Sequence, residues 1–592
     1  MAEDLHSFLS FVQNLDDSHQ QRMNSKVNNW KIPALGILAS VLFLAGCAGL
    51  GSMEKEIEAL GLTASPEPLI LRGNQVELKI EGKFPAKYFA KKASVEATPV
   101  LTWEGGSASY DTQGFQGEDA PGNFTVIPFE SGKAFTYEAS VAYDPGMEDA
   151  AELSVRMLGR QGSKSASFEP IVIGAGVITT PLLVQSDDQF IHIKDSYQRV
   201  LSFNQEATMN FSVNSSAVRP GELKDEDWKE LKSLIELSAK ADSVTVTGAS
   251  IAAYASPEGE ISLNENLATD RANAAADAIT REMKKSKVTA DESFFALQPK
   301  GEDWDGFKQL MQASNIADKN LILRVLEMYS DKNKREEEIR NIAKTYKEIE
   351  KDVLPALRRS QIVLGYDVEG YTDEELTDLC MSNPEILTAD ELLYSATLFE
   401  DLNDKLAIYQ NGMRVHGTDF RAYNNAGWCL AQMGRMNQAW EVFNQALSLE
   451  RNKAVLNNVA AIKRQDGDID GAMQLLNEAA GAGPEVGYNK GIILIQKGDY
   501  SSAISNMGRV STVNMALAKL LNGDASAAKT TLENANDDSA IASYVMAIAC
   551  ARLNDVNGVK KALSDALAKD PTLRSKAEKD LEFRDVRDAI GM

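Results

Sequence analysis

The chain has 592 residues, too many for a single hydrophobic core, so we expect several domains of ordinary size. Its 61 Lys and Arg residues stand against 86 Asp and Glu residues, and the net charge of -25 argues against nucleic acid as a partner. Four cysteines and four histidines, with no CxxC pair and no HExxH sequence, argue against a metal site and give no sign of a cofactor.

Residues 24 to 47 have the pattern of a secretory signal. The basic, polar sequence NSKVNNWK precedes an apolar run from Ile32 to Leu44 that is too short to span a bilayer comfortably. The run ends in Leu-Ala-Gly followed by Cys47, which resembles the lipobox of bacterial lipoproteins. The resemblance implies that Cys47 becomes the lipidated N-terminus and that residues 1–47 are an extension and signal peptide. A plain membrane-anchor helix is the alternative.

The residues behind the cysteine bear on its destination. Ala48, Gly49 and Leu50 follow it, with no acidic pair directly behind. Among lipoproteins this resembles an outer-membrane destination, and we expect a protein that faces the periplasm. Lipid chains would hold it there, because each buried methylene contributes about 0.8 kcal/mol. Residues 48–66 would then be a linker.

Residues 67–185 show the pattern of an all-β domain. Short alternating stretches are separated by turns rich in Gly, Pro, Asn and Asp, which is typical of an immunoglobulin-like sandwich, here without a disulfide. The aromatics of the segment from Lys83 to Phe89 are expected to pack inward. The predicted strands are Gln75–Ile80, Ala93–Trp103, Asn123–Phe129, Phe135–Tyr143, Glu152–Met157 and Ser167–Ile173.

Residues 186–372 alternate strands with helices. The centre is the stretch from Val244 to Arg271, which predicts a strand, a Ser-Pro-Glu-Gly turn and a helix. The other predicted elements are a strand at Ala207–Ala217, a helix at Asp225–Ala239, a strand near Ser293–Pro299 and a last strand at Arg358–Leu364.

This central stretch resembles the OmpA-like domain, by which many outer-membrane proteins hold peptidoglycan. The matching residues are Gly259, Asn264, Leu267, Arg271 and Ala272. The resemblance implies an α/β fold and a site in which an aspartate binds the ammonium of diaminopimelate and the arginine binds its carboxylate.

The chain departs from the family at the aspartate, where it has Ser256. Serine supplies no charge, and Glu258 lies two residues away as a replacement. The candidate peptidoglycan-binding residues are therefore Ser256, Glu258, Asn264 and Arg271.

Residues 303–357 are a charged, helical insertion in this domain. Leu321, Ile322, Val325, Leu326 and Tyr329 predict one apolar face, and the stretch from Lys332 to Lys351 predicts a helix on the domain surface. A partner-binding arm is the alternative.

Residues 373–592 are helical and repetitive. Turns are predicted at Gly434, Gly467, Gly498, Gly523 and Asn554, at intervals of 33, 31, 25 and 31 residues. Small residues at Ala439, Ala472, Ala503 and Ala527 would allow two helices to approach closely, and the short third interval predicts a truncated hairpin. An earlier unit, Leu392 to Arg414, has its turn near Asp401.

These residues resemble tetratricopeptide (TPR) repeats. The sequence Ala-Gly-Trp that ends at Trp428, with Phe443 and Ala446 behind the turn, matches the TPR pattern. The resemblance implies an all-α solenoid whose groove binds peptides or folded protein partners. Tyr423 and Tyr488 are expected to pack within it.

No residues form a catalytic constellation, so we predict a protein that is not an enzyme. The favoured hypothesis is an outer-membrane lipoprotein that acts as a periplasmic scaffold for protein partners in envelope assembly or secretion, through its TPR groove. The alternative is a tether that binds peptidoglycan through the OmpA-like domain.

Overall fold

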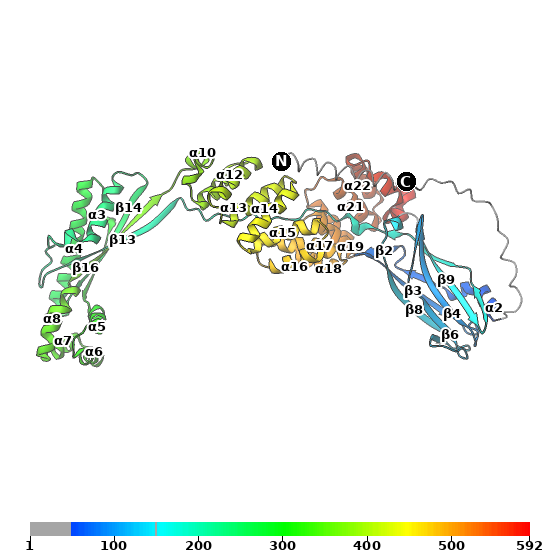
Figure 1. Cartoon of the computed structure of the whole chain (residues 1–592), viewed down its shortest axis with the longest axis horizontal. Helices are drawn as coiled ribbons and strands as arrows, with labels where there is room; N and C mark the ends of the chain where they lie inside the picture. The colour runs from blue at the N-terminus through cyan, green and yellow to red at the C-terminus, as the bar shows by residue number, and fades with distance from the viewer. Residues whose placement is uncertain (1–48, 149–150, 592) are drawn as a thin grey trace, which may run out of the picture. The chain divides into compact units, whose positions relative to one another are not determined.

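The computed structural model describes residues 49–148 and 151–591 (Figure 1). Cys47 and the predicted signal lie outside the described residues. The chain divides into two compact units. The first unit contains the residues up to Asp187 together with those from Lys490 onward, and the second contains Asp188 to Asn489. Among the described residues, no helix has the length and apolar character needed to cross a membrane.

The first unit begins with a short helix, α2 (Leu50–Lys55), and two sheets, whose strands are blue to cyan in Figure 1. One sheet has the order β1-β3-β2-β12, with β8 paired to β3, and the other has the order β10-β9-β4-β6-β7, with β11 on β9 and β5 on β4. The strands of the first sheet are β1 (Thr63–Ser65), β2 (Leu69–Arg72), β3 (Gln75–Phe84), β8 (Lys133–Ala142) and β12 (Val177–Ile178). Those of the second are β4 (Ser94–Trp103), β5 (Gly106–Ser109), β6 (Gln113–Gly117), β7 (Thr125–Ile127), β9 (Glu152–Gln161), β10 (Lys164–Ser167) and β11 (Ile171–Ala175).

The two sheets share one hydrophobic core. Alternate residues of β3, Val76, Leu78 and Ile80, are buried and belong to the same cluster as Val95 of β4 and Leu153 of β9. Because successive side chains of a strand point to opposite faces, this alternation buries one face of each sheet. Five of the six predicted strands are confirmed by β3, β4, β7, β8 and β9.

The sixth predicted strand, Ser167–Ile173, is wrong as a single element. It is divided into β10 and β11 by Phe168, Glu169 and Pro170. Proline has no amide hydrogen for a strand ladder, and Phe168 is buried in the core instead. The aromatics predicted to pack inward do so, since Phe84 and Phe89 are both 1% exposed.

The first unit also contains the last helices of the chain. Arg584 forms an ion pair with Glu67 (3.0 Å), and the hydroxyl of Thr180 donates to the Glu582 carboxylate (2.5 Å), so the β-rich region contacts these last helices. The helices are α18 (Tyr500–Met507), α19 (Val513–Leu521), α20 (Ala525–Glu533), α21 (Ala540–Arg552), α22 (Val556–Lys569), α23 (Leu573–Lys579) and α24 (Arg587–Ile590).

The second unit contains a four-stranded sheet of order β13-β16-β14-β15. β14 and β15 are parallel, and the other neighbours are antiparallel. Two helices, α3 and α4, pack on it through apolar residues such as Leu231 and Ile279. The elements are β13 (Val200–Asn210), α3 (Glu226–Ser238), β14 (Val244–Ala255), α4 (Ile261–Ser286), β15 (Phe295–Glu302) and β16 (Arg359–Glu369).

The predicted central strand and helix are confirmed by β14 and α4, whereas the predicted first strand is displaced. β13 begins at Val200 and ends at Asn210, before a turn in which Asn214 has a φ of 50°. The early residues of β13 are exposed and held by pairing with β16, such as Val200 opposite Glu369. A strand held by pairing rather than burial leaves no hydropathy pattern.

The insertion forms five helices with a core of their own. Ile322, Val325 and Leu326 are buried as predicted, but Leu321 is 44% exposed because it lies beside this stripe. The predicted helix from Lys332 to Lys351 is interrupted at Ile342. The helices are α5 (Trp304–Ala313), α6 (Lys319–Met328), α7 (Lys332–Asn341), α8 (Ala343–Asp352) and α9 (Leu354–Leu357).

The remaining helices run from α10 to α17, and the boundary between the units falls within α17. All five predicted turns are confirmed. Gly434, Gly467, Gly498, Gly523 and Asn554 each follow a helix and have a φ between 56° and 91°. The helices are α10 (Asp373–Ser382), α11 (Ala389–Ser395), α12 (Leu402–Val415), α13 (Phe420–Gln432), α14 (Met436–Leu449), α15 (Lys453–Gln465), α16 (Ile469–Glu478) and α17 (Pro484–Gln496).

The small residues behind the turns show one error. Ala439, Ala472 and Ala503 are 0% exposed and lie five residues after their turn glycines. The predicted fourth member, Ala527, is only half-buried, and Ala528, at the same spacing of five, is 0% exposed. The truncated hairpin is confirmed, because α18 and α19 have 8 and 9 residues where α15 has 13.

This difference between neighbouring alanines makes a prediction. Ala528→Leu should lower the free energy of unfolding by about 1–3 kcal/mol, because the added methylenes have no space between the helices. Ala527→Leu is the matched control and should change it much less. Thermal melting of the two full-length variants measures this. Equal melting temperatures would show that the repeat spacing does not identify the contact.

Candidate functional site

A segment without helix or strand connects the two units, and its residues from Asp188 onward belong to the second. In that unit it passes α15 and α13 before it enters β13 (Figure 1). Side chains of these helices hold its backbone. We call this arrangement the asparagine ladder, formed by Asn424 and Asn425 of α13, Asn457 and Asn458 of α15, and Asn489 of α17.

Three of these asparagines each bind both backbone groups of one segment residue. The side-chain oxygen accepts from the N–H, and the side-chain nitrogen donates to the C=O, as a neighbouring β-strand would do. The pairs are Asn489 with Gln189, Asn458 with Ile191, and Asn425 with Ile193, with distances of 2.6 to 2.9 Å. In the first unit, Asn514 of α19 binds the N–H and C=O of Gln185 in the same way, both at 2.8 Å.

The other two asparagines join these pairs into a network. Asn457 donates to the carbonyl of Gln189 (2.9 Å), and Asn424 donates to that of Ile191 (3.0 Å). Neighbouring helices are linked as well, because Asn458 donates to the side-chain oxygen of Asn424 (2.9 Å). All five asparagines are 0% exposed. A buried carboxamide without partners costs free energy, and the segment supplies those partners.

The ladder follows the period of the helical repeats. Asn425, Asn458, Asn489 and Asn514 each lie nine residues before the turn glycine of their own hairpin. The same position in the next hairpin is Val545, which is also buried. The ladder was not predicted from the sequence, although an asparagine nine residues before each of the four turn glycines was the available signal.

Alternate side chains of the segment bind specific partners. The carboxylate of Asp188 accepts from both Nε (2.6 Å) and Nη2 of Arg464, and the two side chains are 0% and 3% exposed. Phe190 stacks on Phe443 of α14, with ring centroids 6.0 Å apart and an interplanar angle of 5°. The backbone contacts therefore tolerate any sequence, whereas these side chains select one.

His192 makes the third contact of this kind. Its Nε2 lies 2.7 Å from the hydroxyl of Tyr409. The centroids of its ring and the Trp428 ring are 5.2 Å apart, and the two ring planes meet at 74°. Burial, and then the charge of Lys405, lower the pKa of His192, against an opposing effect of Asp195. Burial also raises the pKa of the Tyr409 hydroxyl that shares this hydrogen bond.

The residues predicted from the OmpA-like resemblance lie together in the second unit. Ser256, Asn264 and Arg271 are 4%, 3% and 1% exposed. The guanidinium of Arg271 donates to the carbonyls of Tyr254 (2.8 Å), Ser215 (3.1 Å) and Ser212 (3.3 Å). Its donors are thus directed to backbone of the same chain.

Glu258 pairs with a different arginine. It accepts from Arg358 (2.7 and 3.0 Å) and from the hydroxyl of Ser256 (2.7 Å). Asn264 donates to Glu302 (3.0 Å). The insertion also reaches this loop, because Glu336 of α7 accepts from the N–H of Gly259 (2.6 Å). Carboxylates of this chain therefore occupy the polar groups around the loop.

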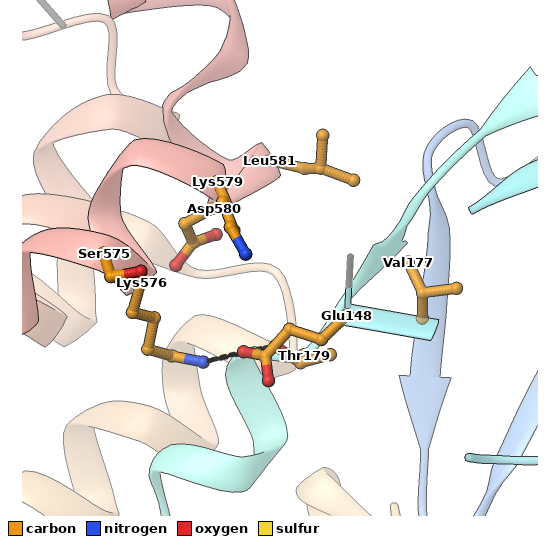
Figure 2. A pocket seen from close by; sticks show the side chains of 8 residues that line it. All are labelled: Glu148, Val177, Thr179, Ser575, Lys576, Lys579, Asp580 and Leu581. Carbon is orange, nitrogen blue, oxygen red and sulfur yellow. Dashed lines mark hydrogen bonds and ion pairs between the residues drawn. The ribbon is translucent and has the colours of Figure 1, made fainter. Parts of the chain in front are cut away.

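The first unit contains a polar cavity of about 310 Å³ (Figure 2). It is lined by side chains that include Glu148, Thr179, Lys576 and Asp580. Lys576 pairs with Glu148, and Tyr544 donates to Asp580 (2.7 Å). The two carboxylates drawn in Figure 2 thus each have a partner within the chain. We assign no chemistry to this cavity.

The thiols and possible metal ligands of the described residues form no reactive site. Cys380, Cys429 and Cys550 are buried and free. Burial raises the pKa of Cys380 to about 11 and that of Cys429 to about 12, which disfavours the reactive thiolate. Within residues 49–148 and 151–591, no three His, Cys, Asp or Glu side chains gather to hold a metal ion.

Comparison with known proteins identifies one part of the chain. Residues 420–453, which include α13 and α14, match the tetratricopeptide repeat family. No protein with a curated description matches the chain. The chain therefore contains a TPR repeat, and this repeat includes Asn424 and Asn425 of the ladder.

Several solved structures are similar to a part of the chain. A tetratricopeptide repeat protein from Parabacteroides merdae is 15% identical, with 36% of this chain and 90% of that one covered and a TM-score of 0.27. PilF from Pseudomonas aeruginosa is also 15% identical, with 37% of this chain and 99% of that one covered and a TM-score of 0.27. The C-terminal part of a TPR repeat-containing protein from Cytophaga hutchinsonii is 14% identical, with 35% of this chain and 92% of that one covered and a TM-score of 0.23.

The buried ion pair of the segment can be tested by substitution. Arg464→Met should lower the free energy of unfolding by about 3–5 kcal/mol, because it leaves the Asp188 carboxylate buried without its partner. Arg414→Met is the control, since Arg414 and Glu385 form an exposed pair that should add little. Urea unfolding of the full chain measures both. If both substitutions change the free energy of unfolding by a similar small amount, the buried ion pair between Asp188 and Arg464 is contradicted.

His192 should make the unit sensitive to acid. Its pKa in the folded chain lies below the ordinary value of 6.5, so the unfolded chain binds more protons as the pH falls through that value, and stability is lost. Below about pH 6, the wild type should lose melting temperature relative to His192→Phe, which cannot be protonated. A constant difference between about pH 8 and about pH 5 would count against a buried neutral imidazole.

Proposed function

We propose that the chain is a non-enzymatic scaffold that holds protein partners in the bacterial envelope, and that the asparagine ladder of its TPR helices is the binding part. The observation that carries this is the row of paired carboxamides that binds an extended backbone. TPR repeats generally bind protein partners, and such a row recognises a peptide main chain.

The envelope location rests on the sequence. The Leu-Ala-Gly-Cys sequence that ends at Cys47 supports a lipoprotein anchored in the outer membrane and facing the periplasm. β14 and α4 form the expected strand, loop and helix, and β14 is hydrogen-bonded to β15 and β16 in one sheet. These two observations support the OmpA-like assignment of this domain.

Between scaffold and peptidoglycan tether, we favour the scaffold. A tether needs Arg271 to bind a carboxylate of the cell wall, whereas its guanidinium is 1% exposed and donates to three backbone carbonyls. Glu258, the replacement for the missing aspartate, is paired with Arg358.

The scaffold is tested by cross-linking in cells that carry the tagged full chain. The double variant Asn425→Ala, Asn458→Ala should lose most of the proteins cross-linked to the wild type, because two backbone clamps are removed. Asn506→Ala, at an exposed position of α18, is the control and should keep them. The double variant must first retain its circular dichroism spectrum. An unchanged set of partners would mean that the ladder is not the binding part.

The tether is tested by sedimentation of the full chain in detergent with purified sacculi. We expect the chain to remain in the supernatant at moderate salt. Sedimentation that is lost in a folded Arg271→Lys variant would establish the tether instead.

A further inference from the structure

The ligand of the asparagine ladder in this structure is a segment of the same chain. The hydrogen bonds described at the backbone of Gln189, Ile191 and Ile193 all come from side chains of the helices. Residues 184–198 form neither helix nor strand, so their departure would break no strand pairing. The segment is therefore bound in the manner of a peptide rather than built into a sheet.

We propose that residues 188–193 are an internal ligand that closes the ladder to partners, and that a partner opens it with an extended segment of the same pattern. That pattern is an acidic residue, then an aromatic residue two positions later and a hydrogen-bonding ring two positions after that, as in Asp188, Phe190 and His192. The inference rests on the proposed scaffold function, since it names the partner class of that site.

The acidic residue follows from Arg464. Its guanidinium is nearly fully buried beneath the segment and has Asp188 as its carboxylate partner. A competing segment that lacks an acid at this position would cover the guanidinium without neutralising it, which is strongly unfavourable. The ladder thus accepts many backbones, but Arg464 admits only those with a carboxylate at one position.

The contacts with α14 explain why the pattern requires an aromatic residue. Those with α12 and α13 explain why it requires a hydrogen-bonding ring. Phe190 stacks on Phe443, which is 0% exposed and belongs to the core of the helices. His192 bonds to Tyr409 and contacts Trp428. Successive side chains of an extended segment alternate in direction, so residues two apart reach this face while those between bind elsewhere.

Covalent attachment makes the internal ligand a strong competitor. A tethered segment has an effective concentration on the order of 1 mM, so it fills a site of about 10 μM affinity about 99% of the time. A free peptide then binds with an apparent affinity lowered about 100-fold. A partner succeeds only if it binds better or is itself held nearby.

The test is fluorescence anisotropy with a labelled, capped peptide of residues 186–193. The wild-type full chain is compared with a chain in which Asp188→Ala, Phe190→Ala and His192→Ala disable the internal ligand. We expect the disabled chain to bind the peptide about 10- to 100-fold more tightly than the wild type. Adding Asn458→Ala should abolish this binding. A peptide with Asp188→Lys should not bind, whereas one with Asp187→Lys, the same charge change at the neighbouring residue, should lose far less.

Two results would overturn the proposal. Equal binding to both chains would show that the internal segment does not close the ladder. Absence of binding to a disabled chain that keeps its circular dichroism and melting transition would show that the segment is a fixed structural strand.

A second measurement applies if the disabled chain does not fold. Trypsin cleavage after Lys194 in the wild type should accelerate when the unlabelled peptide is in large excess, because the displaced segment becomes accessible. An unchanged rate would contradict displacement. The cross-linking experiment is independent of peptide binding. If it finds no partners in cells, the scaffold function fails, but the result of the peptide-binding experiment still stands.

Discussion

The arrangement depends on the need of buried carboxamides for hydrogen-bond partners. Asn424, Asn425, Asn457, Asn458 and Asn489 have no exposed surface, and two neighbouring asparagines satisfy only part of each other's donors and acceptors. The extended segment supplies the remaining N–H and C=O groups at every second residue. The helices would otherwise have to leave these amides to water, so segment and helices specify each other.

This constraint explains why the repeats carry asparagine where an amphipathic helix ordinarily carries an apolar residue. The position nine residues before the turn glycine lies on the side of the helix that meets the segment. In the next hairpin, for whose helices no hydrogen bond to residues 184–198 is described, the position is the buried Val545. The Asp188–Arg464 ion pair and the Phe190–Phe443 stack together fix the register, because a shift of one residue would take the Phe190 ring away from Phe443.

The sequence predicted the elements that local physics dictates. The turn residues Gly434 to Asn554 have left-handed backbone conformations, and glycine or asparagine is favoured there wherever the chain folds. It did not predict the start of β13, whose residues are exposed and held by pairing with β16. Nor did it predict the ladder, because residues 184–198 have no periodicity of their own and one asparagine in a helix is compatible with many environments. The strand, loop and helix pattern was enough to predict that the candidate site residues lie close together. The pairing of Glu258 with Arg358 could be seen only in the folded structure.

The most direct test of the account is amide hydrogen exchange at single-residue resolution along residues 188–194 of the full chain. The amides of Gln189, Ile191 and Ile193 donate to buried asparagines, and those of Phe190 and His192 have no such bond described. We therefore predict slow exchange at the first three and markedly faster exchange at the residues between them. Uniformly fast exchange across the segment would contradict its binding by the ladder.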